Sequence, residues 1–82
     1  MHTAVENLRN LVKETAGMLK DSTIPKDVDH LLEHCYFKTA VQFFGNYLKI
    51  QYYEGRLTEE KFAYLVRKYG FSENQYFQIG ID

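Results

Sequence analysis

The stretch KDVDHLLEHCYFKTAVQFFGNYLKIQYYE, residues 26–54, decides the fold of this chain. Apolar side chains recur in it at every third or fourth residue, which is the period of an α-helix. They fall on two neighbouring stripes: Val28, Leu31, Leu32, Cys35, Thr39, Phe43, Tyr47 and Ile50 on the first, and Phe37, Val41, Phe44, Leu48 and Tyr52 on the second. A helix that is apolar over more than half its circumference must be central to the fold or to an interface.

This stretch predicts either one long helix or two helices that are broken near Tyr36 to Lys38. Pro25 marks its start, because proline disfavours helix in the residue before it and is well tolerated in a first helical turn. Asp27 and Asp29 follow in the first turns, where negative charge offsets the positive end of the helix dipole. The two alternatives for the middle of the stretch remain open at this stage.

Further helices are predicted on both sides of the central stretch. Thr3 and Glu6 have the spacing of a capping box, and the apolar period after them predicts a helix over residues 3–20. Thr58 is the expected N-cap of another helix, which should end at Gly70 because glycine readily adopts the left-handed conformation that stops a helix.

The C-terminal residues predict a fourth, short helix. Ser72 and Gln75 repeat the capping-box spacing, and Gly80 is the expected end of the helix. We therefore predict an all-α fold in a single domain over residues 1–82. The expected architecture is a small bundle of three to four helices, with a long aromatic-rich central helix and a C-terminal hairpin that looks like a helix-turn-helix.

Composition narrows the class of protein. The chain has 82 residues, of which 45% are hydrophobic and 26% charged, so it is too apolar to be intrinsically disordered. A chain of this size buries only about 60% of the surface that it exposes when unfolded, so its core must be thin. The formal charge is −1 with the two signs mixed, which argues against a nucleic-acid scavenger or a binder of anionic membranes.

The single cysteine and the residues at the N-terminus predict that the protein lies in the cytoplasm. Cys35 is the single cysteine, so no internal disulfide can form, and this fits a reducing environment. We interpret it as a buried structural thiol, because its neighbours one helical turn away are Leu31 and Thr39 and no histidine is placed to activate it. The chain shows no signal segment and no apolar run of about 18 residues, so we expect a cytoplasmic protein without a membrane partner.

The sequence HLLEH, residues 30–34, looks like the His-x-x-Glu-His helix of the inverted zinc metallopeptidases. Residues four apart share a helix face, so His30 and His34 can bind one zinc ion. That family needs a further acidic ligand and a substrate cleft in a much larger protein, so we interpret the histidines as part of a polar edge. A structural metal site that uses His30, His34, Cys35 or His2 fits better than the peptidase but less well than the polar edge, and we expect neither a cofactor nor enzymatic activity.

The segment from Thr58 to Ile79 has the hydrophobic spacing of DNA-binding helix-turn-helix units around Gly70. Its would-be recognition helix contains no lysine or arginine and carries Glu73, so nucleic acid is a disfavoured partner. The residues that this alternative would use are Arg56, Lys61, Arg67 and Lys68 on phosphates and Asn74, Gln75 and Gln78 on bases.

The aromatic residues suggest a different function. Seven tyrosines and six phenylalanines all lie between Tyr36 and Phe77. Most should form the core, but the short flanking helices cannot obviously cover both apolar stripes, so one stripe is expected to face another protein or a second copy of the chain. The candidate contacts are Tyr36, Phe44, Tyr47, Tyr52 and Tyr53.

The leading hypothesis is therefore a non-enzymatic interaction module or small regulator, such as an adaptor, an inhibitor or an antitoxin-like protein. It would bind a protein partner, or form a homodimer, through the aromatic helix face. A DNA-binding transcriptional regulator that uses residues 58–78 is the alternative. The sequence does not identify the partner.

Overall fold

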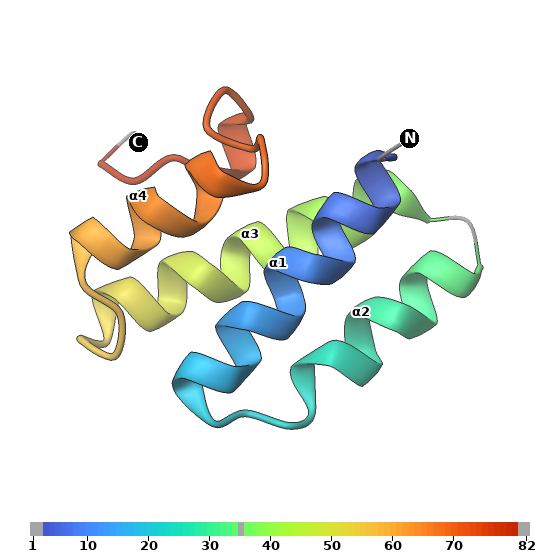
Figure 1. The fold of residues 1–82 in the computed structure, drawn as a ribbon, viewed down its shortest axis with the longest axis horizontal. Coiled ribbons are helices and arrows are strands. Elements are labelled where there is room, and N and C mark those ends of the chain that lie inside the picture. The colour runs from blue at the N-terminus through green and yellow to red at the C-terminus, as the bar shows by residue number, and fades with distance from the viewer. Residues whose placement is uncertain (1–2, 35, 81–82) are drawn as a thin grey trace.

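The computed structural model describes residues 3–34 and 36–80, and these form four α-helices and one turn of 3-10 helix without any strand. The elements are α1 (Ala4–Leu19), α2 (Ile24–Glu33), α3 (Phe37–Tyr53), α4 (Glu59–Lys68) and the 3-10 turn η1 (Gln75–Phe77). Figure 1 shows α1 crossing in front of α3, with α2 beside them. Above them lie α4 and the residues that follow it, 69–80, which we call the C-terminal segment. The predicted all-α class is confirmed.

The helix starts follow the capping residues that the sequence predicts. The Thr3 hydroxyl accepts a hydrogen bond from the Glu6 N–H at 3.1 Å, and Thr58 accepts one from the Lys61 N–H at 3.1 Å. Each bond satisfies one of the backbone donors that a helix start leaves without a partner. Gly70 follows α4 with a φ of 81°, as expected for a glycine stop.

The central stretch forms two helices, so the alternative with a break is the one observed. α2 ends at Glu33 and α3 begins at Phe37. The Tyr36 N–H donates to the Leu31 carbonyl at 3.0 Å and so satisfies a carbonyl at the end of α2. Cys35 and His2 lie outside the described residues. The predictions of a buried thiol at Cys35 and of a metal site that includes Cys35 or His2 therefore also lie outside them.

The short fourth helix is present only as the single 3-10 turn of η1. Its capping side chain is Asn74, which accepts a hydrogen bond from the Tyr76 N–H at 2.9 Å, and not Ser72 as predicted. Gln78, directly after the turn, has extended backbone dihedral angles. The chain after α4 is therefore a compact loop with one helical turn.

α3 is the centre of the fold, because it packs against all four other elements. Its inner face is buried and consists of Ala40, Val41, Phe44 and Leu48. These side chains belong to one core cluster with buried residues of α1, α2, α4 and the C-terminal segment. Burial of this kind supplies most of the stabilisation of a small helical domain.

The C-terminal segment covers one side of α3 through close contacts. The Phe77 ring lies between those of Phe44 and Phe71, with centroid distances of 6.4 and 4.9 Å. Gly45 permits this approach, since a Cβ atom there would collide with the backbone carbonyl of Tyr76. A glycine within a helix costs stability unless it has such a packing role.

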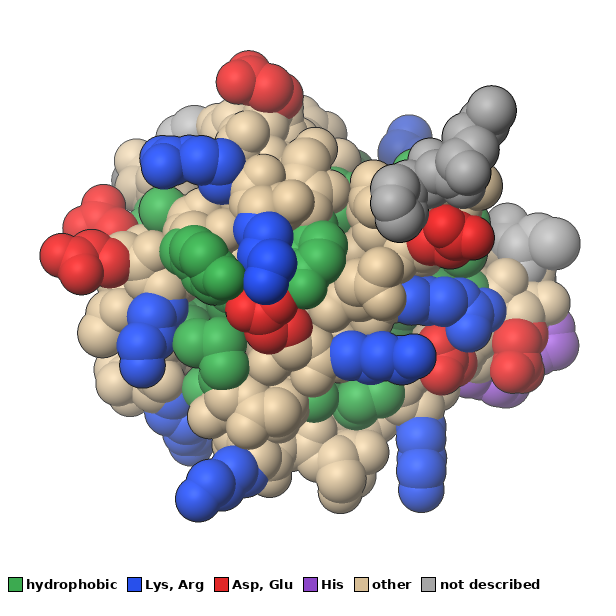
Figure 2. Space-filling view, in the orientation of Figure 1, with side chains coloured by type: hydrophobic (Ala, Val, Ile, Leu, Met, Phe, Trp, Pro, Cys, Tyr) green, Lys and Arg blue, Asp and Glu red, His purple; other side chains and the backbone are tan. Residues whose placement is uncertain are grey.

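Polar contacts join α1 to α4 at the surface. The Glu14 carboxylate accepts from the Lys68 ammonium at 2.8 Å and from the Tyr69 hydroxyl at 2.6 Å. These two hydrogen bonds, that of Lys68 first, hold the pKa of Glu14 below its ordinary value. Figure 2 shows the face over α1 and α4, where basic and acidic side chains are interspersed.

Candidate protein-contact surface

One side of α3 exposes a row of large apolar side chains to solvent. Tyr36 is 58% exposed, Phe43 39%, Ile50 53% and Tyr53 66%. Thr39 and Asn46 lie between them and are also exposed. We call these six residues the outer α3 face: Tyr36, Thr39, Phe43, Asn46, Ile50 and Tyr53.

Spacing places these six residues on one stripe. Successive members are separated alternately by three and four residues, which is the seven-residue repeat that a helix presents to a partner helix. The outer α3 face holds four of the seven large hydrophobic side chains that are exposed in the described part of the chain. The other three are scattered over α1 and α4: Val5, Met18 and Tyr64.

The outer α3 face meets the packed interior at its edges. The Tyr53 ring contacts the Tyr52 ring edge-on, with the centroids 5.2 Å apart, and Tyr52 packs against the core. Phe43 borders a hollow together with Leu31, which also packs against the core. The rest of the outer α3 face is an exposed apolar surface on the side of the helix away from Phe44.

The two borders of the outer α3 face differ in charge. On the side of α2 lies an open hollow of about 380 Å³, which Asp27, His30 and Leu31 line together with Thr39 and Phe43. On the other side of the helix, by helical spacing, lie Gln42 and the lysines Lys38 and Lys49. The surface is thus bordered by a carboxylate on one side and by ammonium groups on the other.

Three of the five predicted contact residues have a different role. Phe44 is fully buried, so its prediction as a surface contact is wrong, because the inner stripe of α3 faces the core. Tyr47 is half-buried, and its hydroxyl donates to the Asp21 carboxylate at 2.9 Å. Tyr52 packs its ring edge-on against Phe62, with the centroids 6.1 Å apart.

The Asp21 carboxylate accepts three hydrogen bonds. It receives hydrogen bonds from the Thr23 hydroxyl at 2.8 Å and from the Thr23 N–H at 3.0 Å, in addition to that of Tyr47. These contacts, the Thr23 hydroxyl first, hold the pKa of Asp21 below its ordinary value. Burial, followed by the hydrogen bond to Asp21, raises the pKa of Tyr47, so the hydroxyl stays protonated and remains a donor.

Tyr36 and Tyr53 are the predicted contacts that lie on the outer α3 face. Sequence reasoning missed Phe43 and Ile50, which it placed in the same stripe as Tyr47. The signal that identifies them is the distance of seven residues from Tyr36 to Phe43 and from Phe43 to Ile50. Tyr47 does not share that spacing, and it turns toward the loop between α1 and α2.

The histidine pair lies at the end of α2. The rings of His30 and His34 meet edge to face with their centroids 4.7 Å apart. Within residues 3–34 and 36–80, no group of three or more potential metal-ligating side chains is arranged around a common point. The pair by itself supplies two of the four ligands that a zinc ion usually takes.

Four of the seven residues of the DNA-binding alternative make side-chain hydrogen bonds within the chain, and the other three are exposed. Arg56 donates to Gln51 and to Glu54, each at 3.2 Å, and Lys68 is paired with Glu14. Lys61, Arg67 and Gln75 are exposed. Asn74 caps η1, and Gln78 donates to the Ser72 carbonyl at 3.5 Å. With one 3-10 turn in place of a recognition helix, DNA binding stays a prediction that no contact of the structure favours.

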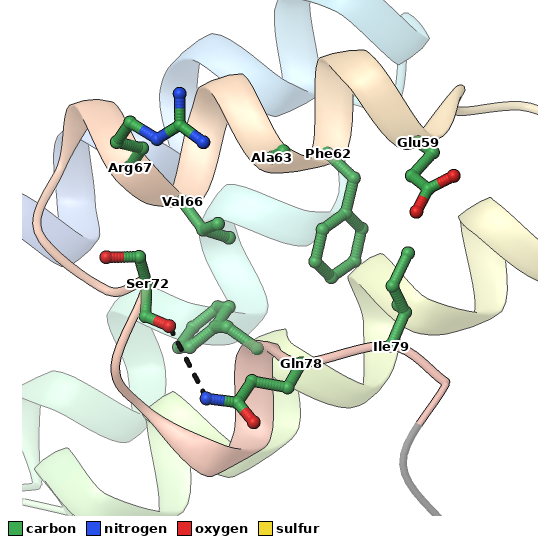
Figure 3. A pocket seen from close by; sticks show the side chains of 9 residues that line it. Glu59, Phe62, Ala63, Val66, Arg67, Ser72, Gln78 and Ile79 are labelled. Atoms are coloured by element: carbon green, nitrogen blue, oxygen red, sulfur yellow. Dashed lines mark hydrogen bonds between the residues drawn. The ribbon is translucent and has the colours of Figure 1, made fainter.

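A second hollow lies between α4 and the C-terminal segment (Figure 3). Its volume is about 320 Å³. Phe62 and Ile79 point toward one another at one end, and Arg67 and Ser72 lie at the other. Its lining includes one carboxylate, that of Glu59, and no histidine, so it does not present the paired acid and base of a hydrolytic site.

No α-helix within residues 3–34 and 36–80 has the length and hydropathy needed to cross a membrane. Comparison of the chain with protein-family models, curated proteins and solved structures finds no match in any of the three.

Proposed function

We propose that this protein is a non-enzymatic interaction module that binds another protein, or a second copy of itself, through the outer α3 face. The observation that carries the proposal is the row of four large apolar side chains, exposed and aligned along one side of a helix. The largest exposed apolar patch of a protein is often a functional surface.

The size of this surface matches that of the largest apolar patch on an ordinary protein. A buried aromatic side chain accounts for about 150–250 Å² of surface, so the four exposed fractions correspond to about 400 Å² of apolar area. The largest apolar patch on a monomeric protein is typically about 300–600 Å², and it is often functional. Covering this area would remove a substantial apolar surface from water.

The surface is also built on a rigid element. The opposite side of α3 is held by Phe44 and Leu48, both fully buried. The partner would therefore meet a helix whose backbone is already ordered, and little conformational entropy is lost on binding. Tyr36 and Tyr53, at the two ends of the surface, provide large contact areas with few rotatable bonds.

The polar border completes the usual anatomy of an interface. Contact surfaces combine an apolar centre with a polar rim that stays partly hydrated. Here the centre is formed by Phe43 and Ile50, and the rim includes Lys38, Lys49 and Asp27. A partner with its own exposed apolar helix face would match this arrangement.

The experiment is site-specific photo-crosslinking in living cells. A benzoyl-phenylalanine replaces Ile50 in one variant and Tyr64 in a control, because these two residues are similarly exposed, at 53% and 51%, on different helices. Position 50 is expected to give protein adducts of discrete mass, and position 64 only a diffuse background. Equal labelling from both positions, or no discrete adduct from position 50, would contradict the proposed function.

A further inference from the structure

We infer that the occupant of the outer α3 face is a second copy of this chain, packed with its α3 parallel to the first around a two-fold axis along the helices. This inference rests on the proposed function, and it adds the identity and the orientation of the partner. Three properties of the described residues support it: the spacing of the outer α3 face, the place of Asn46 within it, and the charge of its two borders.

The spacing matches self-pairing. The residues Tyr36, Phe43 and Ile50 occupy one position of a seven-residue repeat, and Thr39, Asn46 and Tyr53 occupy the position three residues further on. These are the two positions that interlock when helices pack side by side at a small crossing angle. In a parallel pair each of these residues meets the same residue of the other copy, so the four large apolar residues face apolar residues, and Thr39 and Asn46 face their own counterparts.

Asn46 distinguishes the parallel arrangement from the antiparallel one. In a parallel pair its amide faces the partner's Asn46, and each can donate to the carbonyl oxygen of the other. In an antiparallel pair with the stripes in full overlap, Asn46 faces the partner's Phe43 and Thr39 faces the partner's Ile50. The amide would then be buried against an aromatic ring without a hydrogen-bond partner, which is unfavourable.

The charges at the borders favour the same orientation. A two-fold axis parallel to the helices brings the α2 side of one copy against the lysine side of the other. The side with Asp27 is then turned toward the side of the partner that carries Lys38 and Lys49, so opposite charges lie on the facing borders. An antiparallel pair would instead bring Asp27 toward the partner's Asp27 and lysines toward lysines.

The area is sufficient for a reversible dimer. Two copies of the outer α3 face together bury about 800 Å² of apolar surface, to which the polar residues at the borders add. This apolar area lies below the limit of about 1,200 Å² for stable specific interfaces, in the range of weak and transient ones. We therefore expect a dimer that dissociates on dilution, with a Kd on the order of micromolar or weaker.

The test uses the full chain with Cys35→Ser, so that introduced cysteines are the only thiols. Two variants carry Thr39→Cys or Ile50→Cys, and the second is isotopically labelled so that mixed and like pairs differ in mass. Positions 39 and 50 are 11 residues apart on one helix, or about 16 Å, so a single orientation cannot favour both kinds of pair. The two variants are mixed and oxidised mildly.

A parallel dimer is expected to give disulfides between like variants, Thr39→Cys with itself and Ile50→Cys with itself. A Lys20→Cys variant, whose position is exposed at the end of α1, is the control and should stay largely unlinked. Circular dichroism melting confirms that each variant is folded. A majority of mixed disulfides between positions 39 and 50 would overturn the parallel arrangement.

Light scattering of the unmodified chain gives an independent readout. A mass that rises from one chain toward two with concentration is expected, and a single-chain mass up to about 1 mM would overturn self-association. If the photo-crosslinker at position 50 then captures a different protein at a discrete mass, the proposed function stands and only this inference fails. If it captures nothing, both fail.

Discussion

The two sides of α3 carry similar residues and have opposite surroundings. Phe43 and Phe44 are neighbours in sequence and identical in chemistry, yet Phe43 is 39% exposed and Phe44 is fully buried. All four other elements pack against α3, and α2 also borders the open hollow beside Phe43. The sequence shows that both sides of α3 carry apolar residues, but only the tertiary structure shows which side the other helices bury.

This comparison suggests a division of roles within one helix. The inner face stabilises the monomer, and we propose that the outer α3 face serves association. The predictions below test that division, beginning with the largest expected effect on stability.

Replacing each of the two neighbouring phenylalanines by alanine should give the largest difference in stability between the two faces of α3. Phe44→Ala removes a ring from the core and is expected to lower the free energy of unfolding by about 3–5 kcal/mol. Phe43→Ala removes a ring that is 39% exposed and should lower it by less, about 1–2 kcal/mol. Urea unfolding monitored by circular dichroism measures both values, and similar losses in the two variants would show that the outer face contributes to the core.

The two helical glycines should respond in opposite directions to alanine. Gly45→Ala places a methyl group against the Tyr76 backbone and is expected to destabilise the protein by about 1–3 kcal/mol. Gly17→Ala is the matched control in α1, where no other group lies within 4 Å of the added Cβ, and it should stabilise by about 0.5–1 kcal/mol. Thermal unfolding of both variants tests this, and a neutral Gly45→Ala would mean that η1 does not approach α3 so closely.

Removal of the Tyr47 hydroxyl should have a smaller effect, with a defined pH dependence. Tyr47→Phe deletes one donor to Asp21, so the pKa of Asp21 should rise toward its ordinary value near 3.8. A carboxyl group whose pKa is lowered by folding stabilises the protein above its unfolded pKa, and this contribution is lost as the pH falls through the folded pKa. The unmodified chain should therefore lose more stability than Tyr47→Phe between about pH 5 and pH 2.

An NMR titration of the Asp21 carboxyl group gives the pKa directly. Tyr53→Phe is the control, because the Tyr53 hydroxyl contacts the Gly80 N–H at 3.5 Å and is not hydrogen-bonded to Asp21. An Asp21 pKa that is the same in Tyr47→Phe as in the unmodified chain would exclude the hydroxyl as a determinant.

The helices could largely be predicted because their signals are local. Thr3 and Thr58 cap the helices that they precede, and Gly70 stops the helix that it follows, through bonds or dihedral angles within a few residues. The C-terminal turn could not be predicted in the same way. The packing of Phe77 against Phe44 and Phe71 and the approach of Tyr76 to Gly45 are tertiary contacts, which local capping patterns do not contain.

The candidate surface could be predicted only in part. Its location on the central helix follows from the excess of apolar residues over residues 36–53. Which residues it contains depends on the loop at Asp21, which turns Tyr47 inward, and on the core, which takes Phe44. Among the predicted contacts, Tyr36 and Tyr53 lie on the outer α3 face, and Phe43 and Ile50 replace Phe44, Tyr47 and Tyr52.

A charged residue placed on the outer α3 face tests the central claim most directly. Phe43→Glu is compared with Met18→Glu, since the two positions are equally exposed, at 39% and 38%, on α3 and α1. Sedimentation velocity over a range of concentrations measures association, and thermal unfolding measures stability. Phe43→Glu is expected to remain folded as a monomer at every concentration, while Met18→Glu associates like the unmodified chain. Association that persists in Phe43→Glu, or is lost equally in both variants, would contradict the account.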